Sequence, residues 1–115
     1  MLPARSRMTS ATDFASTMRQ GSRSGRSTVV VYLKQTGHAD SLAGFAVSKA
    51  VGGAVVRNRV KRRLRAILAE LLPTLPPNSS VVVRALPRSA QVDFATLRSD
   101  VTDATRTALR KAALS

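Results

Sequence analysis

The chain has 115 residues, no cysteine, and a formal net charge of +13 from nineteen cationic and six acidic side chains. This length favours one domain, residues 1–115, which folds without disulfides or a thiolate metal site. No apolar run approaches the ~20 residues of a membrane span, and the N-terminus lacks the apolar stretch of a signal peptide. We therefore expect a cytoplasmic protein that makes no membrane contact.

The type of cationic side chain indicates which class of partner the protein binds. Fifteen of the nineteen cations are Arg, whose planar fork binds phosphate and whose face stacks on bases. A protein of the membrane surface would carry more Lys beside exposed Trp, Phe or Leu, but Trp is absent here. The composition favours nucleic acid as the partner.

The first twenty residues divide into an arm and a helix. Residues 1–9 are basic and lack periodicity, which predicts a flexible arm. Ser10 as N-cap, Asp13 three residues later and Gly21 as stop signal predict a helix between them. Two large side chains share one face of this helix, and their default role is packing in a core: Phe14 and Met18.

A β-rich region follows. Residues 21–27 predict a basic loop with a short edge strand, and residues 28–34 predict a strand from their β-branched content. Alternation places Val29, Val31 and Leu33 on one face, and Thr28, Val30, Tyr32 and Lys34 on the other. A tyrosine between Thr and Lys on its own face predicts an accessible surface.

Residues 35–40 predict a hairpin connection to a second strand at residues 43–48. His38 has no other candidate metal ligand near it in the sequence and predicts a solvated loop residue. Gly52 and Gly53 then allow a tight entry into the next helix.

The central helix, residues 54–71, combines a buried face with a strongly basic one. Six of the nine residues 57–65 are cationic, and no acid occurs between Asp40 and Glu70. Such like charges repel one another, so the pattern favours phosphate binding over a solvated amphipathic face, which usually mixes signs. One ridge of the helix carries the three cations Arg57, Lys61 and Arg65. The other flank carries Arg59 and Arg63. The apolar face would bury Val56, Val60, Leu64, Ile67, Leu68 and Leu71.

Prolines end that helix, and residues 80–86 predict a strand buried on both faces. A last helix at residues 93–112 would bury Phe94, Leu97, Val101, Ala108 and Leu109. The order is helix, two or three strands, helix, strand, helix. Strands joined through a helix require a parallel pair, so the class is α+β with helices packed on a mixed sheet.

Catalytic groups are scarce. None of the six acids forms a close pair with the histidine in the sequence, and there is no phosphate-binding glycine loop or metal-ligand spacing. Asp100 and Asp103 lie three apart on one helix, where exposed surface positions explain them better than a metal site. The residues alone predict an RNA-binding protein.

Residues 54–65, which read Ala-Val-Val-Arg-Asn-Arg-Val-Lys-Arg-Arg-Leu-Arg, resemble the Arg-Asn-Arg signature of the bacterial ribonuclease P protein subunit. Four further segments match the family in order and spacing: Asp13-Phe14, Val31-Tyr32, Gly-Phe-Ala-Val-Ser-Lys at 44–49, and Arg-Ala-Leu-Pro at 84–87. The resemblance covers nearly the whole chain.

The resemblance implies the fold of the second domain of ribosomal protein S5, with a left-handed strand-helix-strand crossover. It implies an endoribonuclease holoenzyme that removes the 5′ leader of precursor tRNA. In that holoenzyme the RNA subunit is the catalyst, Mg²⁺ is bound mainly by the RNA subunit and substrate, and the protein is a monomer with no catalytic or metal-binding residue of its own.

The resemblance also implies two sets of binding residues. The RNA-subunit face would comprise Ser48, Lys49, Arg57, Asn58, Arg59, Lys61, Arg62 and Arg65. The leader would be bound by Phe14, Met18, Tyr32, Arg84 and Arg88. Met18 stands where the family often has a second aromatic, and Ala50 where a second cation commonly follows Lys49. The alternatives are a structural RNA-binding protein of ribosomal type and a nuclease that acts alone.

Overall fold

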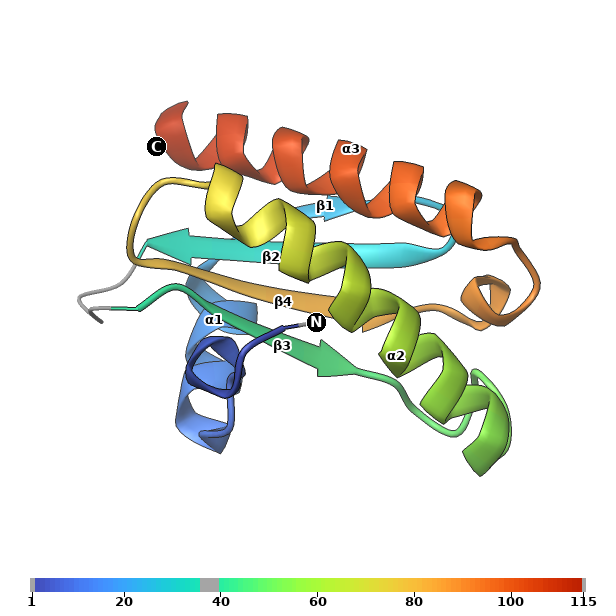
Figure 1. The fold of residues 1–115 in the computed structure, drawn as a ribbon. Helices are drawn as coiled ribbons and strands as arrows, with labels where there is room; N and C mark the ends of the chain where they lie inside the picture. Colours follow the sequence, from blue (N-terminus) through green and yellow to red (C-terminus); the bar gives the residue numbers. More distant parts are fainter. Residues whose placement is uncertain (1, 36–39, 115) are drawn as a thin grey trace.

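A computed structural model describes residues 2–35 and 40–114, which form a four-stranded sheet with helices on both faces (Figure 1). The elements in chain order are a 3-10 turn (Ala4–Ser6), α1 (Ala11–Gln20), β1 (Ser22–Gly25), β2 (Val29–Gln35), β3 (Leu42–Ala46), α2 (Ala54–Leu71), a 3-10 turn (Leu72–Thr74), β4 (Ser79–Ala85), a 3-10 turn (Pro87–Ala90) and α3 (Phe94–Leu114). The predicted α+β class and element order are confirmed, including the short edge strand β1. None of the described helices is long and apolar enough to cross a membrane.

The sheet has the order β1-β2-β4-β3 and is mixed. β1 and β2 pair antiparallel, β2 and β4 pair antiparallel, and β3 and β4 are parallel neighbours joined through α2. The predicted hairpin between the second and third strands is therefore wrong, because β4 lies between β2 and β3. His38 and the rest of residues 36–39 lie outside the described residues.

The crossover through α2 has the unusual hand. In Figure 1, α2 lies in front of the sheet, β3 and β4 both run to the right, and β4 lies above β3. This arrangement makes the connection left-handed, which is rare because strand twist normally favours the right-handed path. It agrees with the fold that the resemblance implies.

The main core fills the space between the sheet and the two long helices. Alternate residues of β2 and of β4 pack against the apolar stripes of α2 and α3, as the periodicity predicts. Fully buried members include Val29, Val31, Leu33, Val60, Leu64, Val81, Val83, Leu97 and Val101. One predicted core residue is wrong: Phe94 remains 38% exposed, because the buried stripe of α3 begins only at Leu97.

A second, smaller core lies on the opposite face under α1. Ser10 caps α1 by accepting a hydrogen bond from the Asp13 backbone N–H, and Gly21 follows its end, both as predicted. Thr17 and Ser80 share a buried hydroxyl hydrogen bond of 2.9 Å that joins α1 to β4. These contacts fix α1 across the sheet.

The segment before α1 departs from the predicted flexible arm. Leu2 and Met8 are 2% and 6% exposed, the Met8 N–H donates to the Ala43 carbonyl, and Arg7 forms a parallel bridge with Ala43. Residues 2–9 therefore pack along the free edge of β3. Leu2 and Met8 are the apolar residues that indicate packing of this segment, and its basic composition hides them.

The close approach of α1 to β3 depends on Gly44. A Cβ atom there would lie 2.6 Å from the Phe14 ring and 3.0 Å from the Met8 sulfur, closer than normal contact allows. Only a residue without a side chain therefore lets Phe14 settle on the sheet at its present position.

We predict that Gly44→Ala lowers the free energy of unfolding by about 1–3 kcal/mol through overpacking. Urea unfolding followed by circular dichroism would measure the change. Gly25→Ala is the matched control, because the nearest atom to a Cβ there lies at 3.9 Å. An equal loss in both variants would show that strand conformation, and not the Phe14 contact, requires Gly44.

Candidate nucleic-acid interface

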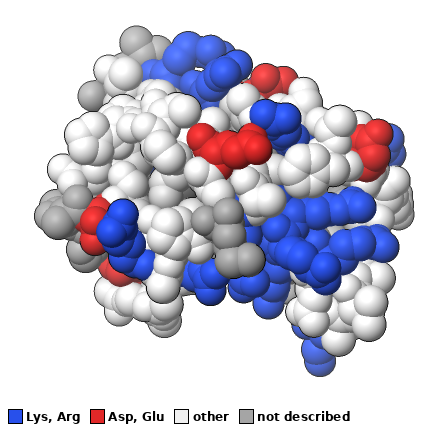
Figure 2. Space-filling view, viewed as in Figure 1, with Lys and Arg blue, Asp and Glu red and all other residues white. Residues whose placement is uncertain are grey.

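The N-terminal half of α2 presents the densest group of cations. Its buried stripe, which includes Val60, Leu64 and Ile67, holds the helix on the sheet, so its charged residues must face outward. Figure 2 shows the resulting blue group over this half of α2. Within residues 2–35 and 40–114, no carboxylate forms an ion pair with any of these cations. No ion pair inside the described structure therefore offsets their mutual repulsion, and the longer-range attraction between Arg63 and Asp93 reaches only one flank of α2.

The outward residues near the start of α2 form its most accessible part. Asn58 and Arg62 are exposed, and Ser48 and Lys49 are exposed in the turn that precedes the helix. Arg57 is half-buried, and its buried Nε atom has no hydrogen-bond partner among the described residues. These five residues lie within one stretch of the chain, residues 48–62.

The turn that brings them together depends on glycine. Gly52 adopts φ of +156°, and a Cβ there would lie 2.8 Å from the Val56 side chain. The predicted tight entry into the helix is confirmed at this residue.

Two cations of α2 bind the protein itself. Arg59 donates to the Ala90 carbonyl at 3.3 Å, and Arg63 donates to the Val92 carbonyl at 3.2 Å. Both residues therefore lie on the side of α2 toward the connection between β4 and α3. This is the flank on which helical periodicity places them. Arg59 remains exposed but stands apart from the ridge with which the resemblance groups it.

Lys61 and Arg65 point to the other side of α2, into a groove at the free edge of β3. The groove has a volume of about 290 Å³. Its remaining lining comes from the N-terminal segment, α1 and β3: Arg7, Met8, Thr9, Phe14, Ala43, Gly44 and Phe45. Three cations and two aromatic rings thus share one hollow. The structure here brings two members of the expected RNA-subunit face to Phe14, a residue expected to bind leader.

Sequence reasoning did not single out Arg7 or Phe45. Arg7 is hidden in a segment whose composition predicts disorder, and Phe45 is one of several apolar residues in an edge strand. Their shared position follows from the pairing of residues 7 and 43, which no local pattern reveals.

Tyr32 is less accessible than its neighbours in the sequence predict. It is 7% exposed and packs in the same small core as Val82, Phe14 and Met18. The Arg23 guanidinium lies 5.9 Å from its ring centroid. The prediction of an accessible tyrosine is wrong because α1 and β1 cover the ring, and strand alternation carries no information on either element.

Arg84 and Arg88 extend this face toward the end of β4. Arg84 pairs in register with Val30 on one side and Ala46 on the other, and its buried Nε atom has no hydrogen-bond partner within residues 2–35 and 40–114. Arg88 is exposed in the 3-10 turn that follows. Phe14 and Met18 are both half-buried at the edge of the same face.

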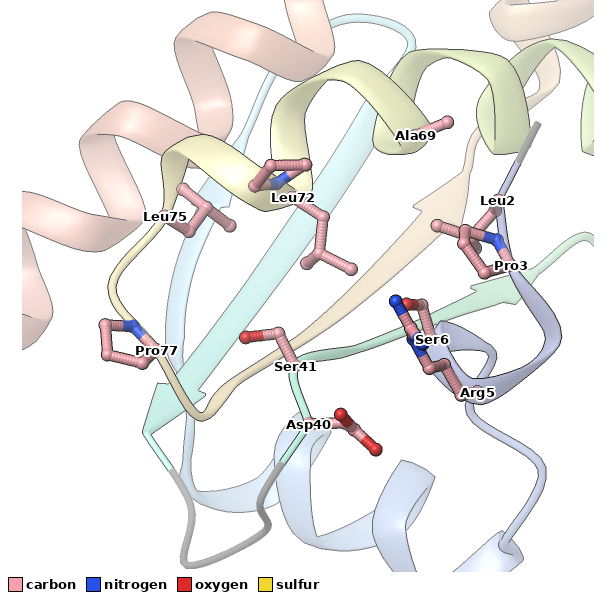
Figure 3. Close-up of a pocket in the computed structure, with 11 residues that line it drawn as sticks. Leu2, Pro3, Arg5, Ser6, Asp40, Ser41, Ala69, Leu72, Leu75 and Pro77 are labelled. Atoms are coloured by element: carbon pink, nitrogen blue, oxygen red, sulfur yellow. The ribbon is translucent and has the colours of Figure 1, made fainter.

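A larger hollow of about 570 Å³ lies elsewhere, below the C-terminal end of α2 (Figure 3). Its lining is mainly leucine and proline side chains, and it includes the cation Arg5 and the acid Asp40. With one cation and one acid, it lacks the charge that a polyanion requires.

The acidic side chains Asp100, Glu70 and Asp103 do not gather at one site. Asp100 accepts a 2.6 Å hydrogen bond from Thr28, Glu70 pairs with Arg98 at 2.9 Å, and Asp103 is exposed. Among the described residues, no group of three or more His, Cys, Asp or Glu could hold a metal ion.

Asp93 links the end of the basic surface to α3. Its carboxylate accepts a 2.8 Å hydrogen bond from the Thr96 backbone N–H. Hydrogen bonds from Thr96, helped by the positive charge of Arg63, hold the pKa of Asp93 below its usual value. A lowered pKa in the folded state stabilises the fold above the unfolded pKa, and this contribution is lost as pH falls through the folded value.

We predict that Asp93→Asn removes one acid-sensitive component of stability. Thermal unfolding between neutral and strongly acidic pH would measure it. The wild-type melting temperature should fall more steeply with acidification than that of the variant, with Asp103→Asn as the charge-matched control. Parallel curves for wild type and Asp93→Asn would contradict this role.

Comparisons with known proteins agree with the fold. The family model for ribonuclease P matches residues 2–109. The ribonuclease P protein component of Kocuria rhizophila is 47% identical over 113 residues, which cover 98% of this chain and all of that protein. The RNase P protein of Thermotoga maritima has a TM-score of 0.74 at 25% identity, covering 90% of this chain and 96% of that chain. The Staphylococcus aureus RNase P protein has a TM-score of 0.79 at 21% identity, covering 90% and 94%.

The family match therefore spans the sheet, α1, α2, most of α3 and the basic turn before α2, and not the cationic segment alone. A relative close to half identical along its full length supports the same assignment. The chain belongs to the ribonuclease P protein family.

Proposed function

We propose that this protein is the subunit of ribonuclease P that binds the catalytic RNA and the 5′ leader of precursor tRNA, and so assists removal of the leader. The observation that carries the proposal is the groove at the edge of β3. There, Lys61 and Arg65 of the basic helix face Phe14 of α1 across one hollow. Such a site can hold phosphate and base of one RNA strand at the same time.

The RNA subunit would bind the accessible start of α2. Arg57, Asn58 and Arg62 lie there beside Ser48 and Lys49, without an acidic partner among the described residues. Arginine forks bind phosphate in bidentate geometry and keep their charge at every physiological pH. Docked RNA would supply the negative charge that relieves their repulsion. Arg59 would contribute at the margin, because one of its donors already binds the Ala90 carbonyl.

The leader would cross the face of the sheet beside α1. Phe14 and Met18 offer partly exposed edges for stacking, and Arg84 and Arg88 offer charge. Base stacking on aromatic side chains is worth about 1–3 kcal/mol per base and tolerates many sequences. Tyr32 would form the floor of this path and support the rings above it, since it is 7% exposed.

Lys61 and Arg65 would stand where the two RNAs meet. Their helix carries the face for the RNA subunit, whereas their side chains line the hollow next to Phe14. We infer that they neutralise backbone phosphates at this junction. The protein would thereby bring the leader close to the catalytic RNA as a monomer in the cytoplasmic holoenzyme.

Magnesium would be bound by the RNA subunit and the substrate. The described residues do not fit a protein-held ion, since no three potential ligands gather in one place. The contribution of the protein is then positioning and charge neutralisation.

Reconstitution with a bacterial ribonuclease P RNA tests the proposal. We expect faster cleavage of precursor tRNA at low magnesium with the protein than with RNA alone. Binding of RNA without any stimulation would favour a structural protein of ribosomal type. Cleavage by the protein without the RNA subunit, and its loss in Asp100→Asn or Asp103→Asn, would favour a nuclease that acts alone.

We predict that Arg62→Ala flattens the salt dependence of RNA-subunit binding by about one unit in the slope of log K against log salt concentration. Filter binding over a range of salt would measure the slope. Arg98→Ala is the control, because Arg98 is equally charged but pairs with Glu70 on another surface. Unchanged slopes for Arg62→Ala would remove this residue from the interface.

We predict that Phe14→Leu weakens binding of precursor tRNA to the holoenzyme by about five- to tenfold, the loss of roughly 1 kcal/mol of stacking. Mature tRNA, which has no leader, should bind as before. Phe94→Leu is the matched control, since Phe94 is an exposed aromatic on the outer side of α3. Equal losses for precursor and mature tRNA would exclude leader stacking on Phe14.

A further inference from the structure

A second group of cations lies at the far edge of the sheet from the groove. Arg23 belongs to β1, Arg26 follows it in the turn to β2, and Arg110 lies near the C-terminal end of α3. Figure 2 shows blue surface toward this end of α3, separated from the α2 group by white and red surface. These three residues are the β1–α3 patch.

Two guanidinium groups of the patch converge on one hydroxyl. Arg26 and Arg110 each direct an Nη2 atom at Thr107 Oγ1, at 3.1 and 3.2 Å. No carboxylate in the described part of the chain pairs with either group. Cations are favourable near the end of a helix because of its dipole, which accounts for Arg110. The dipole does not account for Arg26, which a strand turn delivers to the same place.

The remaining hydrogen bonds of Arg26 hold it there. Its Nη1 atom donates to the Gly25 carbonyl at 2.9 Å and to Ser24 Oγ at 3.3 Å. Lys111 also crosses from α3 to β1, where its Nζ donates to the Arg23 carbonyl at 2.8 Å. The positive charge at this edge is therefore fixed in place by both elements.

The strand register gives the separation between the patch and the groove. The strand register places Arg23 beside Tyr32, Tyr32 beside Val82, and Val82 beside Gly44. At about 4.8 Å per strand, the row crosses the sheet in roughly 14 Å. Gly44 lines the groove, and Arg23 lies over Tyr32 at the other end. Tyr32 and Val82 in this row are buried beneath α1, so the row sets only the separation between the groove and the β1–α3 patch, and a single strand of RNA that leaves the groove must pass around α1 to reach the patch.

We propose that the β1–α3 patch binds backbone phosphates of the 5′-distal part of the leader, upstream of the nucleotides held by the groove and the face beside α1. The inference rests on the proposed function. Contact with phosphates is independent of sequence, which suits a segment that differs between precursors. It predicts an affinity that rises with leader length and falls with salt.

The test compares two precursor tRNAs bound to the reconstituted holoenzyme. One leader has about 4 and the other about 16 nucleotides, the range over which compact domains follow a single strand. The variant is Arg26→Gln with Arg110→Gln. The control is Arg5→Gln with Arg98→Gln, which removes the same charge from exposed positions outside the patch. Circular dichroism and melting confirm folding, and Arg110→Gln alone serves if the double variant melts early.

We expect the wild type to show a steeper salt dependence for the long leader than for the short one. The double variant should flatten the long-leader slope by about 1.4, because each phosphate contact contributes roughly 0.7 on a single strand. Arg110→Gln alone should remove about half of this. The short leader and the control variant should show no change.

Two results would overturn the inference while leaving the proposed function intact. The first is a long-leader slope that the double variant leaves unchanged although the wild-type protein stimulates cleavage. The second is an equal loss for both leaders, which would assign the patch to the RNA subunit or the tRNA body. Absence of any protein-dependent stimulation would instead refute the proposed function.

Discussion

Hydrophobic burial of α2 fixes a group of mutually repelling cations on the outer side of this helix, and the rest of the structure depends on this constraint. The apolar stripe of α2 is enclosed by the sheet and α3, and this burial fixes the cations of residues 57–65 on the outside of one helix. No acid of the described chain neutralises the ridge, so the folded protein maintains an electrostatic field that attracts polyanions. The same packing that stabilises the domain therefore presents its most densely cationic surface.

Much of the fold could be predicted because its signals are local. The β-branched alternation of β2, the apolar periodicity of α2 and the Ser10 cap of α1 each reflect interactions within one element. The basic face of α2 is equally local, since six cations fall within nine residues. These features can be predicted without knowing which helices and strands pack against one another.

Other features could not be predicted, because they arise from contacts between distant segments. Tyr32 was expected to be accessible from its strand neighbours, but α1 and β1 cover it. Arg7 lies in a segment that resembles an unstructured arm, yet it pairs with Ala43 and lines the groove. The groove itself joins the N-terminal segment, α1, β3 and α2, so its existence follows only from the tertiary arrangement.

The strand order also constrains how the chain folds during synthesis. β4 is the last strand in the sequence but lies between β2 and β3, and its register pairs Leu42 with Ser80 across the whole of α2. Before β4 has left the ribosome, β1 and β2 have only each other, and β3 has no strand beside it. An isolated two-stranded hairpin is marginally stable at best, and long-range pairings form slowly. The complete basic segment of α2 is thus synthesised before the sheet that supports it can form.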